Sequence, residues 1–488
     1  MNQPSLSSVR QISKNSLFLL VARAIDFLSQ IAIIPIVARY LGAESYGDYG
    51  YVMAFAFITT SFTYMGLERI TMREIAKNPS DAGKYLGAGI IARWIYMGLA
   101  IALTTVIVLA MDLSPKIILS ICVASLALNF TADTFIYLAM FKAFDKMRYE
   151  TLLASIFQCF NFGFVFLVSY LRLGFVAFFI GLLAANFLRY MAAMAIASRK
   201  FTMPDYKNGL PLIKPLLKES YILGLVSLII QGFVNVDILI LKALKNTFEV
   251  AMFYAPHNLL ILMSVVPISI MSGFFPSLSR SAGADARLLV YKYEKVFRIF
   301  AIVGIFLAAM CIVFANKIIL IFYGQEFVGA IPAFQILAAS LIFTMLFSVV
   351  DFTLVAVKRQ HVLIWCFLCG LIIRAALDLV LIPRYGYMGA SVAALSGYVI
   401  IFAIGFSMLS RYTIFLPLHR VILKPVFVVG VIGLCLSQFN QGNIYLLSLI
   451  GFVLYLLCLW GLKSFLPDEM DFFKRVMQKA AGVSLKNS

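Results

Sequence analysis

The sequence predicts an all-α membrane protein that crosses the bilayer many times, and three observations lead to this fold class. Of the 488 residues, 62% are hydrophobic and 13% are charged, whereas charged residues make up roughly 25% of an ordinary soluble domain. Apolar runs continue from residue 16 to residue 466, which excludes a soluble domain held by one anchor. Because the backbone finds no water to bind inside lipid, spans this numerous are expected to be helices.

The individual helices are predicted from length and from the turns between them. A helix needs about 20 residues to cross roughly 30 Å of hydrocarbon. Polar turn sequences such as Asn78-Pro79-Ser80-Asp81 and Asn208-Gly209-Leu210-Pro211 divide the apolar sequence at such intervals. The sequence therefore predicts about fourteen transmembrane helices. Their approximate ranges are 15–38, 46–67, 88–110, 117–141, 149–171, 174–198, 219–241, 250–275, 296–316, 328–357, 361–383, 386–410, 420–437 and 444–462.

The distribution of basic residues predicts the orientation. Lys and Arg total 40 against 22 Asp and Glu, which gives a net charge of +18. If the N-terminus is inside, 29 of the 40 basic residues lie in inside loops and tails, 7 lie outside and 4 lie within spans. Cytoplasmic loops collect Lys and Arg, so we expect a multi-pass protein of the cytoplasmic (inner) membrane with both termini in the cytoplasm. The same bias accounts for most of the net charge, and no nucleic-acid partner is expected.

The sequence argues against an enzyme. No predicted connection is long enough to hold a soluble catalytic domain, and no G-x-x-x-x-G-K phosphate loop occurs. Cys366 and Cys369 have C-x-x-C spacing, but no second pair or nearby His completes a metal site. We therefore predict no cofactor and no metal. Transport, if it occurs, must draw on an ion gradient, the membrane potential or the substrate gradient.

Two pairs of similar segments indicate an internal repeat. The segment from Arg172 to Ala177 resembles that from Arg384 to Gly389. The segment 39–51 resembles the segment 242–254. Each half would contain six helices. Because six is an even number, both halves would enter the membrane from the same side, so the repeat is parallel, with a pseudo-twofold axis. Such a repeat suits alternating access through a central cavity. Similar turn chemistry without a repeat remains the alternative. The predicted parts are an N-terminal lobe (1–200), a C-terminal lobe (201–411), two additional helices (412–466) and a cytoplasmic tail (467–488).

The motifs at the ends of the first and eleventh helices resemble those of a known family. These motifs are Lys14-Asn15-Ser16, the segment from Ile31 to Gly42 followed by Tyr46-Gly47, and the segment from Arg384 to Ala390. With them the chain resembles the polysaccharide transporter family, the Wzx-type oligosaccharide flippases of the MOP exporter superfamily. The resemblance implies two six-helix lobes plus two additional helices.

The resemblance also implies a function. Such a protein flips a polyprenyl-pyrophosphate-linked oligosaccharide, the repeat unit of O-antigen, capsule or exopolysaccharide, from the cytoplasmic to the outer face. Its partners would be that lipid-linked substrate, membrane lipid and proteins of glycan assembly. One departure is that Phe248-Glu249-Val250 lacks a glycine corresponding to Gly47, which weakens the symmetry of the repeat.

Charged residues within the predicted spans are the candidate site. A charge in lipid costs several kcal/mol unless it faces water, a partner or substrate. Arg93, Asp237 and Asp351 lie within about two turns of a helix end, where the side chain can reach the headgroups. The others lie deeper, where a buried ion pair and a role in a cavity are the alternatives. The nine residues are Arg23, Asp26, Arg93, Asp133, Arg189, Asp237, Asp351, Arg374 and Asp378.

The deep arginines predict an anionic cargo. Guanidinium stays charged and binds phosphate oxygens bidentately, so Arg23, Arg189 and Arg374 are the candidates for the pyrophosphate or for acidic sugars, with Arg93 a weaker fourth. Arg23 and Asp26 are spaced i, i+3, and Arg374 and Asp378 i, i+4, so each pair shares a helix face and could form an ion pair. Such pairing without any role in transport is the alternative.

Acidic residues in the spans are candidates for ion coupling or for pairing in the cavity. In the drug-antiporter branch of the superfamily an acidic residue on the first helix takes part in cation coupling, and Asp26 is similar in placement. Asp133 and Asp378 are the other candidates. The coupling ion would be a proton or a sodium ion.

The leading function is thus a secondary transporter that flips a lipid-linked oligosaccharide through an Arg-lined cavity. The main alternative is a cation-coupled multidrug antiporter, whose cavity should be acidic and aromatic; three deep arginines disfavour cationic cargo. A membrane-embedded glycan polymerase or acyltransferase would need a large loop with a polar catalytic cluster. A channel or scaffold without turnover is the remaining alternative.

Overall fold

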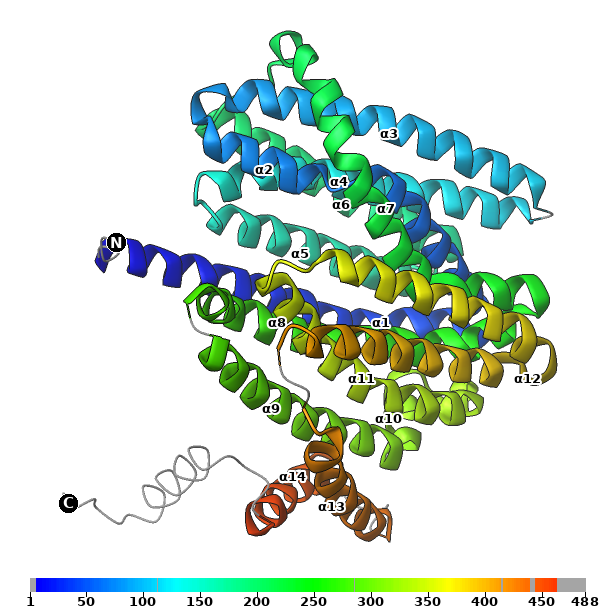
Figure 1. The fold of residues 1–488 in the computed structure, drawn as a ribbon. Coiled ribbons are helices and arrows are strands. Elements are labelled where there is room, and N and C mark those ends of the chain that lie inside the picture. The colour runs from blue at the N-terminus through cyan, green and yellow to red at the C-terminus, as the bar shows by residue number, and fades with distance from the viewer. Residues whose placement is uncertain (1–5, 112, 285, 414–415, 439–443, 463–488) are drawn as a thin grey trace. The chain divides into compact units, whose positions relative to one another are not determined.

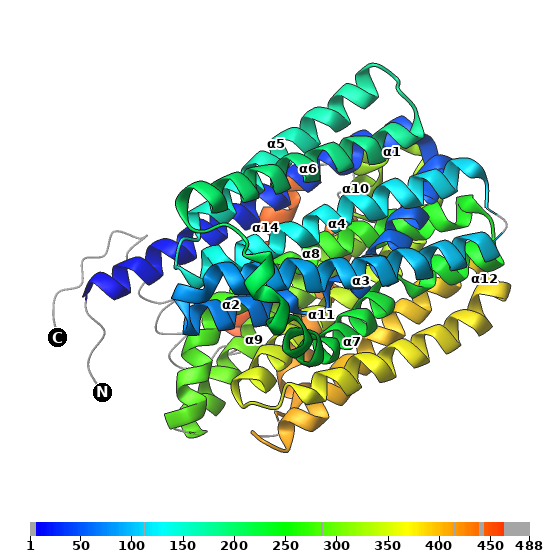
Figure 2. The ribbon, with the colours of Figure 1, turned by 90° about the horizontal axis from the view of Figure 1, so that it is seen from above.

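The computed structural model describes residues 6–111, 113–284, 286–413, 416–438 and 444–462. These residues are helical almost throughout and contain no strand, as Figures 1 and 2 show. The tail predicted at 467–488 lies outside the described residues. The elements are α1 (Leu6–Tyr64), α2 (Leu67–Lys77), η1 (Pro79–Asp81), α3 (Ala82–Ala110), α4 (Pro115–Ala143), α5 (Arg148–Tyr170), α6 (Phe175–Lys200), α7 (Tyr206–Leu244), α8 (Thr247–Ala284), α9 (Ala286–Val313), α10 (Ala315–Phe322), η2 (Gln325–Ala330), α11 (Ile331–Ala356), α12 (His361–Ser410), α13 (Leu418–Gln438) and α14 (Ile444–Gly461).

Two of these helices are each two helices joined at a glycine. The backbone leaves the helical conformation at Gly42 in α1, with φ 71°, and at Gly386 in α12, with φ 56°. Positive φ is readily available only to glycine. Ten helical segments are long and apolar enough to cross a membrane, and two shorter apolar ones lie in α13 and α14. Dividing α1 and α12 at their glycines gives fourteen apolar helical segments among the described residues, the two in α13 and α14 being the shorter ones. This agrees with the predicted number of about fourteen.

The chain divides into two compact units. The first comprises residues 1–258, 321–330 and 367–393. In it α4 packs against α6, α1 against α5, and α3 against α7. Its core includes Leu86, Tyr137 and Phe141, none of which has exposed surface.

The second unit comprises residues 259–320, 331–366 and 394–488. There α9 packs against α11 and α13. Phe306 and Tyr455 stack with ring centroids 5.3 Å apart, and the Tyr455 hydroxyl donates a hydrogen bond to the Ile302 carbonyl at 3.1 Å. This bond satisfies the one polar atom that Tyr455 brings into the apolar core.

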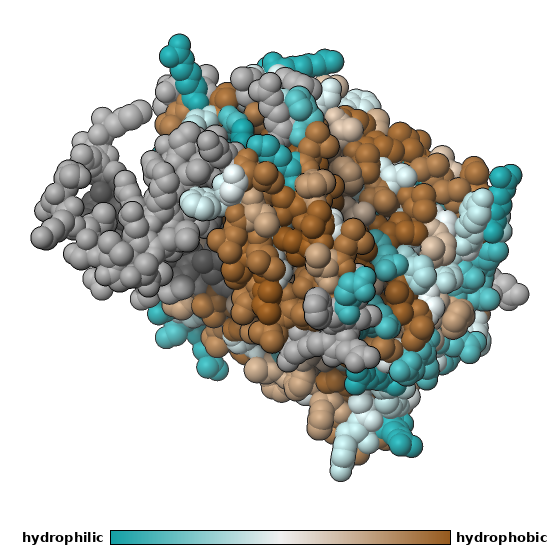
Figure 3. Space-filling model, turned by 90° about the horizontal axis from the view of Figure 1, so that it is seen from below, coloured by the Kyte–Doolittle hydropathy of each residue, from teal (hydrophilic) through white to brown (hydrophobic). Residues whose placement is uncertain are grey.

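The exterior of the helices is apolar. Large side chains such as Leu109 and Leu434 are 78% and 73% exposed, and Figure 3 shows apolar residues over much of the visible face. Burying such side chains is worth about 1.5–3 kcal/mol each, so a water-soluble fold would not leave so many outside. In a bilayer these side chains contact the hydrocarbon of the lipid instead of water. We conclude that the chain is a multi-pass membrane protein.

The start of α7 differs from the prediction. Asn208 to Pro211 was expected to form a turn between spans, yet α7 begins at Tyr206 and contains it. The Asp205 side chain caps this helix, accepting hydrogen bonds from the Asn208 backbone N–H at 3.1 Å and the Asn208 amide at 2.8 Å. These bonds hold the pKa of Asp205 below its usual value.

Candidate functional site

A buried ion pair joins α7 to α12 within the first unit. Arg374 donates from Nε to Oδ1 of Asp237 at 2.7 Å, and a second guanidinium nitrogen donates to the other carboxylate oxygen. Neither side chain has any exposed surface. The Arg374 guanidinium also lies over the Phe233 ring, 4.9 Å from its centroid. A bidentate pair of this kind is held in one geometry.

Two further titratable residues surround this pair. Asp378, one turn after Arg374, is fully buried and close enough to Asp237 and Arg374 to interact electrostatically with both. His257 of α8 is 2% exposed and interacts with the same two residues. Neither carboxylate oxygen of Asp378 and neither ring nitrogen of His257 has a well-formed hydrogen bond among the described residues. The cluster thus holds two carboxyl groups for one guanidinium, so a bound proton or cation would make it neutral.

A second buried pair lies between α3 and α4. Arg93 Nε is 2.9 Å from Oδ1 of Asp133, and the Arg93 guanidinium donates to the backbone and side-chain oxygens of Asn129. Arg93 is 1% exposed and Asp133 6%. One cation faces one anion here, so this pair is neutral by itself.

Arg189 is placed differently. It lies near the middle of α6, is partly exposed, and forms no ion pair among the described residues. Its guanidinium lies over the rings of Phe157 and Phe135, 5.5 and 5.8 Å from their centroids. It also interacts electrostatically with Asp26. Aromatic faces hold a guanidinium in place without neutralising it.

The first helix carries the last two predicted residues. Asp26 accepts a hydrogen bond from the Gln158 amide of α5 at 2.9 Å. Arg23 is exposed and, within the described chain, is not ion-paired with Asp26. The pairing suggested by the i, i+3 spacing is therefore not formed.

Two other expectations are corrected by these contacts. Arg93 and Asp237 were expected to reach the headgroups, but both are buried in ion pairs. Arg374 shares a helix face with Asp378, yet its bidentate partner is Asp237, 137 residues away. Sequence spacing shows which residues share a helix and not which helix packs beside it. The sequence shows His257 only as a polar residue within a predicted span. Nothing in the sequence indicates that it lies near Asp237 and Arg374.

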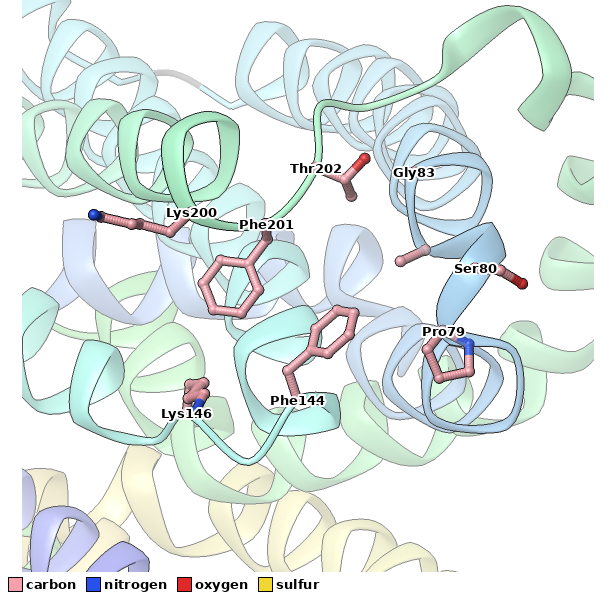
Figure 4. Close-up of a pocket in the computed structure, with 9 residues that line it drawn as sticks. Pro79, Ser80, Gly83, Phe144, Lys146, Lys200, Phe201 and Thr202 are labelled. Carbon is pink, nitrogen blue, oxygen red and sulfur yellow. The ribbon is translucent and has the colours of Figure 1, made fainter.

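A surface pocket lies away from these residues. It has a volume of 380 Å³ and is formed by the connections that follow α2, α4 and α6, as Figure 4 shows. Its two charged lining residues, Lys146 and Lys200, are exposed. None of the predicted site residues lines it. Both lysines belong to loops predicted to face the cytoplasm, where basic residues are common.

Comparison with known proteins agrees with the fold. A family model described as "Polysaccharide biosynthesis protein" matches residues 12–282. The uncharacterized membrane protein MJ1068 of Methanocaldococcus jannaschii is 24% identical over 205 residues, which is 40% of this chain and 39% of that protein. The lipid II flippase MurJ, in an inward closed conformation, superposes with a TM-score of 0.72 at 15% identity, covering 91% of this chain and 97% of that chain. An inward-facing multidrug resistance MATE transporter gives 0.66 at 16% identity, covering 79% and 93%.

The chain thus shares the all-α membrane fold of these two structures. The two neighbours are described as a lipid II flippase and a multidrug resistance transporter. The chain belongs to the polysaccharide biosynthesis protein family, because that family's model covers more than half of it. Both the predicted fold class and the predicted family are confirmed.

Proposed function

We propose that the protein flips a polyprenyl-pyrophosphate-linked oligosaccharide across the cytoplasmic membrane by alternating access. The observation that carries the cargo assignment is Arg189, a guanidinium halfway along a transmembrane helix that interacts with Asp26 but forms no direct ion pair among the described residues. A charge kept there is costly, and binding an anionic group repeatedly during transport is a reason for it. The family supports a glycan as the rest of the cargo.

The four arginines predicted to bind substrate separate into two kinds. Arg93 and Arg374 are occupied by Asp133 and Asp237, and we assign them to holding helices together. Arg189 and Arg23 keep accessible guanidinium groups, and we assign the pyrophosphate or acidic sugars to them. In this proposal the two lobes are residues 1–200 and 201–411, both termini are cytoplasmic, and proteins of glycan assembly act before and after transport.

A bacterial strain that lacks its own flippase tests this function. Expression of the protein should restore glycan on the cell surface, because the cargo would again reach the outer face. Susceptibility to cationic drugs should stay unchanged, since Arg189 would repel a cation. The competing function is a MATE-like antiporter, favoured by the partly exposed Asp26 on the first helix. Drug resistance without surface glycan would replace the flippase proposal with that one.

We further propose that Asp378 binds the coupling ion, a proton or a sodium ion. Asp133 is neutralised by Arg93, and Asp26 is held by Gln158 near the positive charge of Arg189. Asp378 is the extra carboxyl group beside a guanidinium already bound by Asp237, so its charge changes most easily by binding a cation.

In vesicles that contain the lipid-linked oligosaccharide, Asp378→Asn should still flip cargo but should no longer respond to an imposed pH or sodium gradient. Exposure of the glycan to an added glycosidase measures the flipping. Asp26→Asn and Asp133→Asn are matched carboxylate-to-amide controls and should keep the response. If the response survives in Asp378→Asn and disappears in Asp26→Asn, coupling belongs to the first helix instead.

A further inference from the structure

Both glycine junctions in the first unit are held by a carboxylate from a distant segment. The Ala43 N–H, directly after Gly42, donates to Glu326 Oε2 at 2.9 Å. The Tyr387 N–H, directly after Gly386, donates to Glu249 Oε2 at 2.7 Å. Glu326 belongs to η2 and Glu249 to the first turn of α8. The two junctions are therefore stabilised in the same way from different parts of the chain.

Helix chemistry explains why a carboxylate binds there. The helix that starts after each glycine has N–H groups without partners and carries the positive end of its dipole. A side chain at the helix start normally caps such groups, but glycine has none. A Cβ at Gly42 would lie 2.9 Å from Glu326 Oε2, and one at Gly386 would lie 2.2 Å from Glu249 Oε2. Glycine thus supplies both the positive φ and the room for the carboxylate.

Other contacts gather around these two caps. Lys242 Nζ is 2.8 Å from Asp48 Oδ1 and also donates to the Thr247 hydroxyl at 2.6 Å. A Cβ at Gly47 would lie 2.1 Å from the Thr247 carbonyl oxygen. The part of α1 that follows Gly42 therefore crosses the start of α8 so closely that the two backbones are in contact. The salt bridge and this crossing, like the Glu326 cap, join residues of 1–200 to residues of 201–411.

We propose that Glu326 is a positioning residue that latches the two lobes together at this end of the transporter and must release before cargo can pass, while Glu249 forms the matching cap within residues 201–411. The inference rests on the proposed transport function, in which the two lobes separate at one end at a time. By the charge distribution this would be the outer end. Glu326 is exposed and Glu249 partly so, and water can therefore replace each hydrogen bond when the segments part, which makes the latch reversible.

Thiol labelling of the purified full-length protein tests the latch without any cargo. Met252 in α8 is fully buried and follows Ala251, whose backbone N would lie 3.0 Å from a Cβ at Gly47 in α1, so Met252→Cys reports opening of the crossing between α1 and α8. The native Cys311 is buried in the second unit and is kept to report unfolding. The other six cysteines are replaced by serine.

In this background Glu326→Ala should raise the labelling rate at position 252 about tenfold, which is the effect of losing roughly one charge-assisted hydrogen bond between the lobes. Glu249→Ala breaks the matching cap within one lobe and should label close to the parent rate, and the double variant should label like Glu326→Ala, with Cys311 unreactive throughout. Glu326→Gln keeps an oxygen that accepts the Ala43 N–H and should label close to the parent rate. Glu326→Asp is too short to reach and should behave like the alanine variant.

Glu44→Ala is the matched control, because Glu44 is an exposed carboxylate two residues after Gly42 with no interaction within the described chain. An unchanged labelling rate in Glu326→Ala, or an equal rise in Glu249→Ala or Glu44→Ala, would overturn the proposal. If an alanine variant unfolds, Cys311 reacts as well, and the comparison of Glu326→Gln with Glu326→Asp then decides. Because labelling needs no glycan, a failed latch and a failed flippase assignment give separate results.

Discussion

Replacing Arg374 by alanine is expected to cost the fold about 3–5 kcal/mol, the usual cost of removing one partner from a buried ion pair. Arg374 is the cation that faces Asp237 and Asp378, and all three side chains are completely buried. Without it two carboxyl groups would remain in an apolar interior with no positive charge from this residue. Such a loss is a large part of the stability of a typical domain. Thermal unfolding of the detergent-purified protein, followed by gel filtration, measures it.

Neutralising the carboxyl groups should reverse this loss. In the triple variant Arg374→Met, Asp237→Asn and Asp378→Asn no buried charge is left unpaired, and we expect most of the folded protein to return. Arg189→Ala is the matched arginine control, because Arg189 forms no ion pair among the described residues and its removal exposes no buried acid. A single Arg374→Ala variant as stable as the parent would show that the cluster does not hold α7 against α12.

The fold class was predictable because lipid imposes simple rules on sequence. Length, apolarity and turn residues located fourteen helices, and Gly42 and Gly386 fall at the predicted ends of the first and eleventh. The start of α7 was missed because Asp205 caps a helix that begins before the membrane span. Helix formation there depends on one local hydrogen-bonding residue and not on the hydropathy pattern.

The site was predictable only as a set of residues. The sequence identified the buried charges, since a charge in a span is conspicuous whatever surrounds it. It could not separate Arg374, which is bound to Asp237, from Arg189, which lies against two aromatic rings. Whether an arginine has a carboxylate partner depends on which helices pack together. Asp378 is the acidic residue nearest to Arg374 in the sequence, but Asp237 forms the bidentate pair with it. The roles of these residues in transport remain predictions.

Arg189→Ala should lower glycan flipping roughly 10- to 100-fold while leaving the protein folded. A hydrogen bond to a charged group is worth about 1.5–3 kcal/mol, and the Arg189 guanidinium lies over the rings of Phe135 and Phe157 without a direct ion pair among the described residues. Lysine keeps the charge and loses the planar fork, so Arg189→Lys should restore part of the rate. The measurement is surface glycan in flippase-deficient cells, normalised to the amount of protein in the membrane.

Arg93→Ala is the informative comparison for this variant. It removes the same side chain from the buried pair with Asp133 and should reduce the amount of folded protein, with flipping per folded molecule little changed. Arg23→Ala should slow flipping without affecting stability, because Arg23 is exposed. If Arg189→Ala flips glycan at the parent rate, the anionic part of the cargo does not bind this guanidinium, and Arg23 becomes the one remaining accessible arginine of the four predicted.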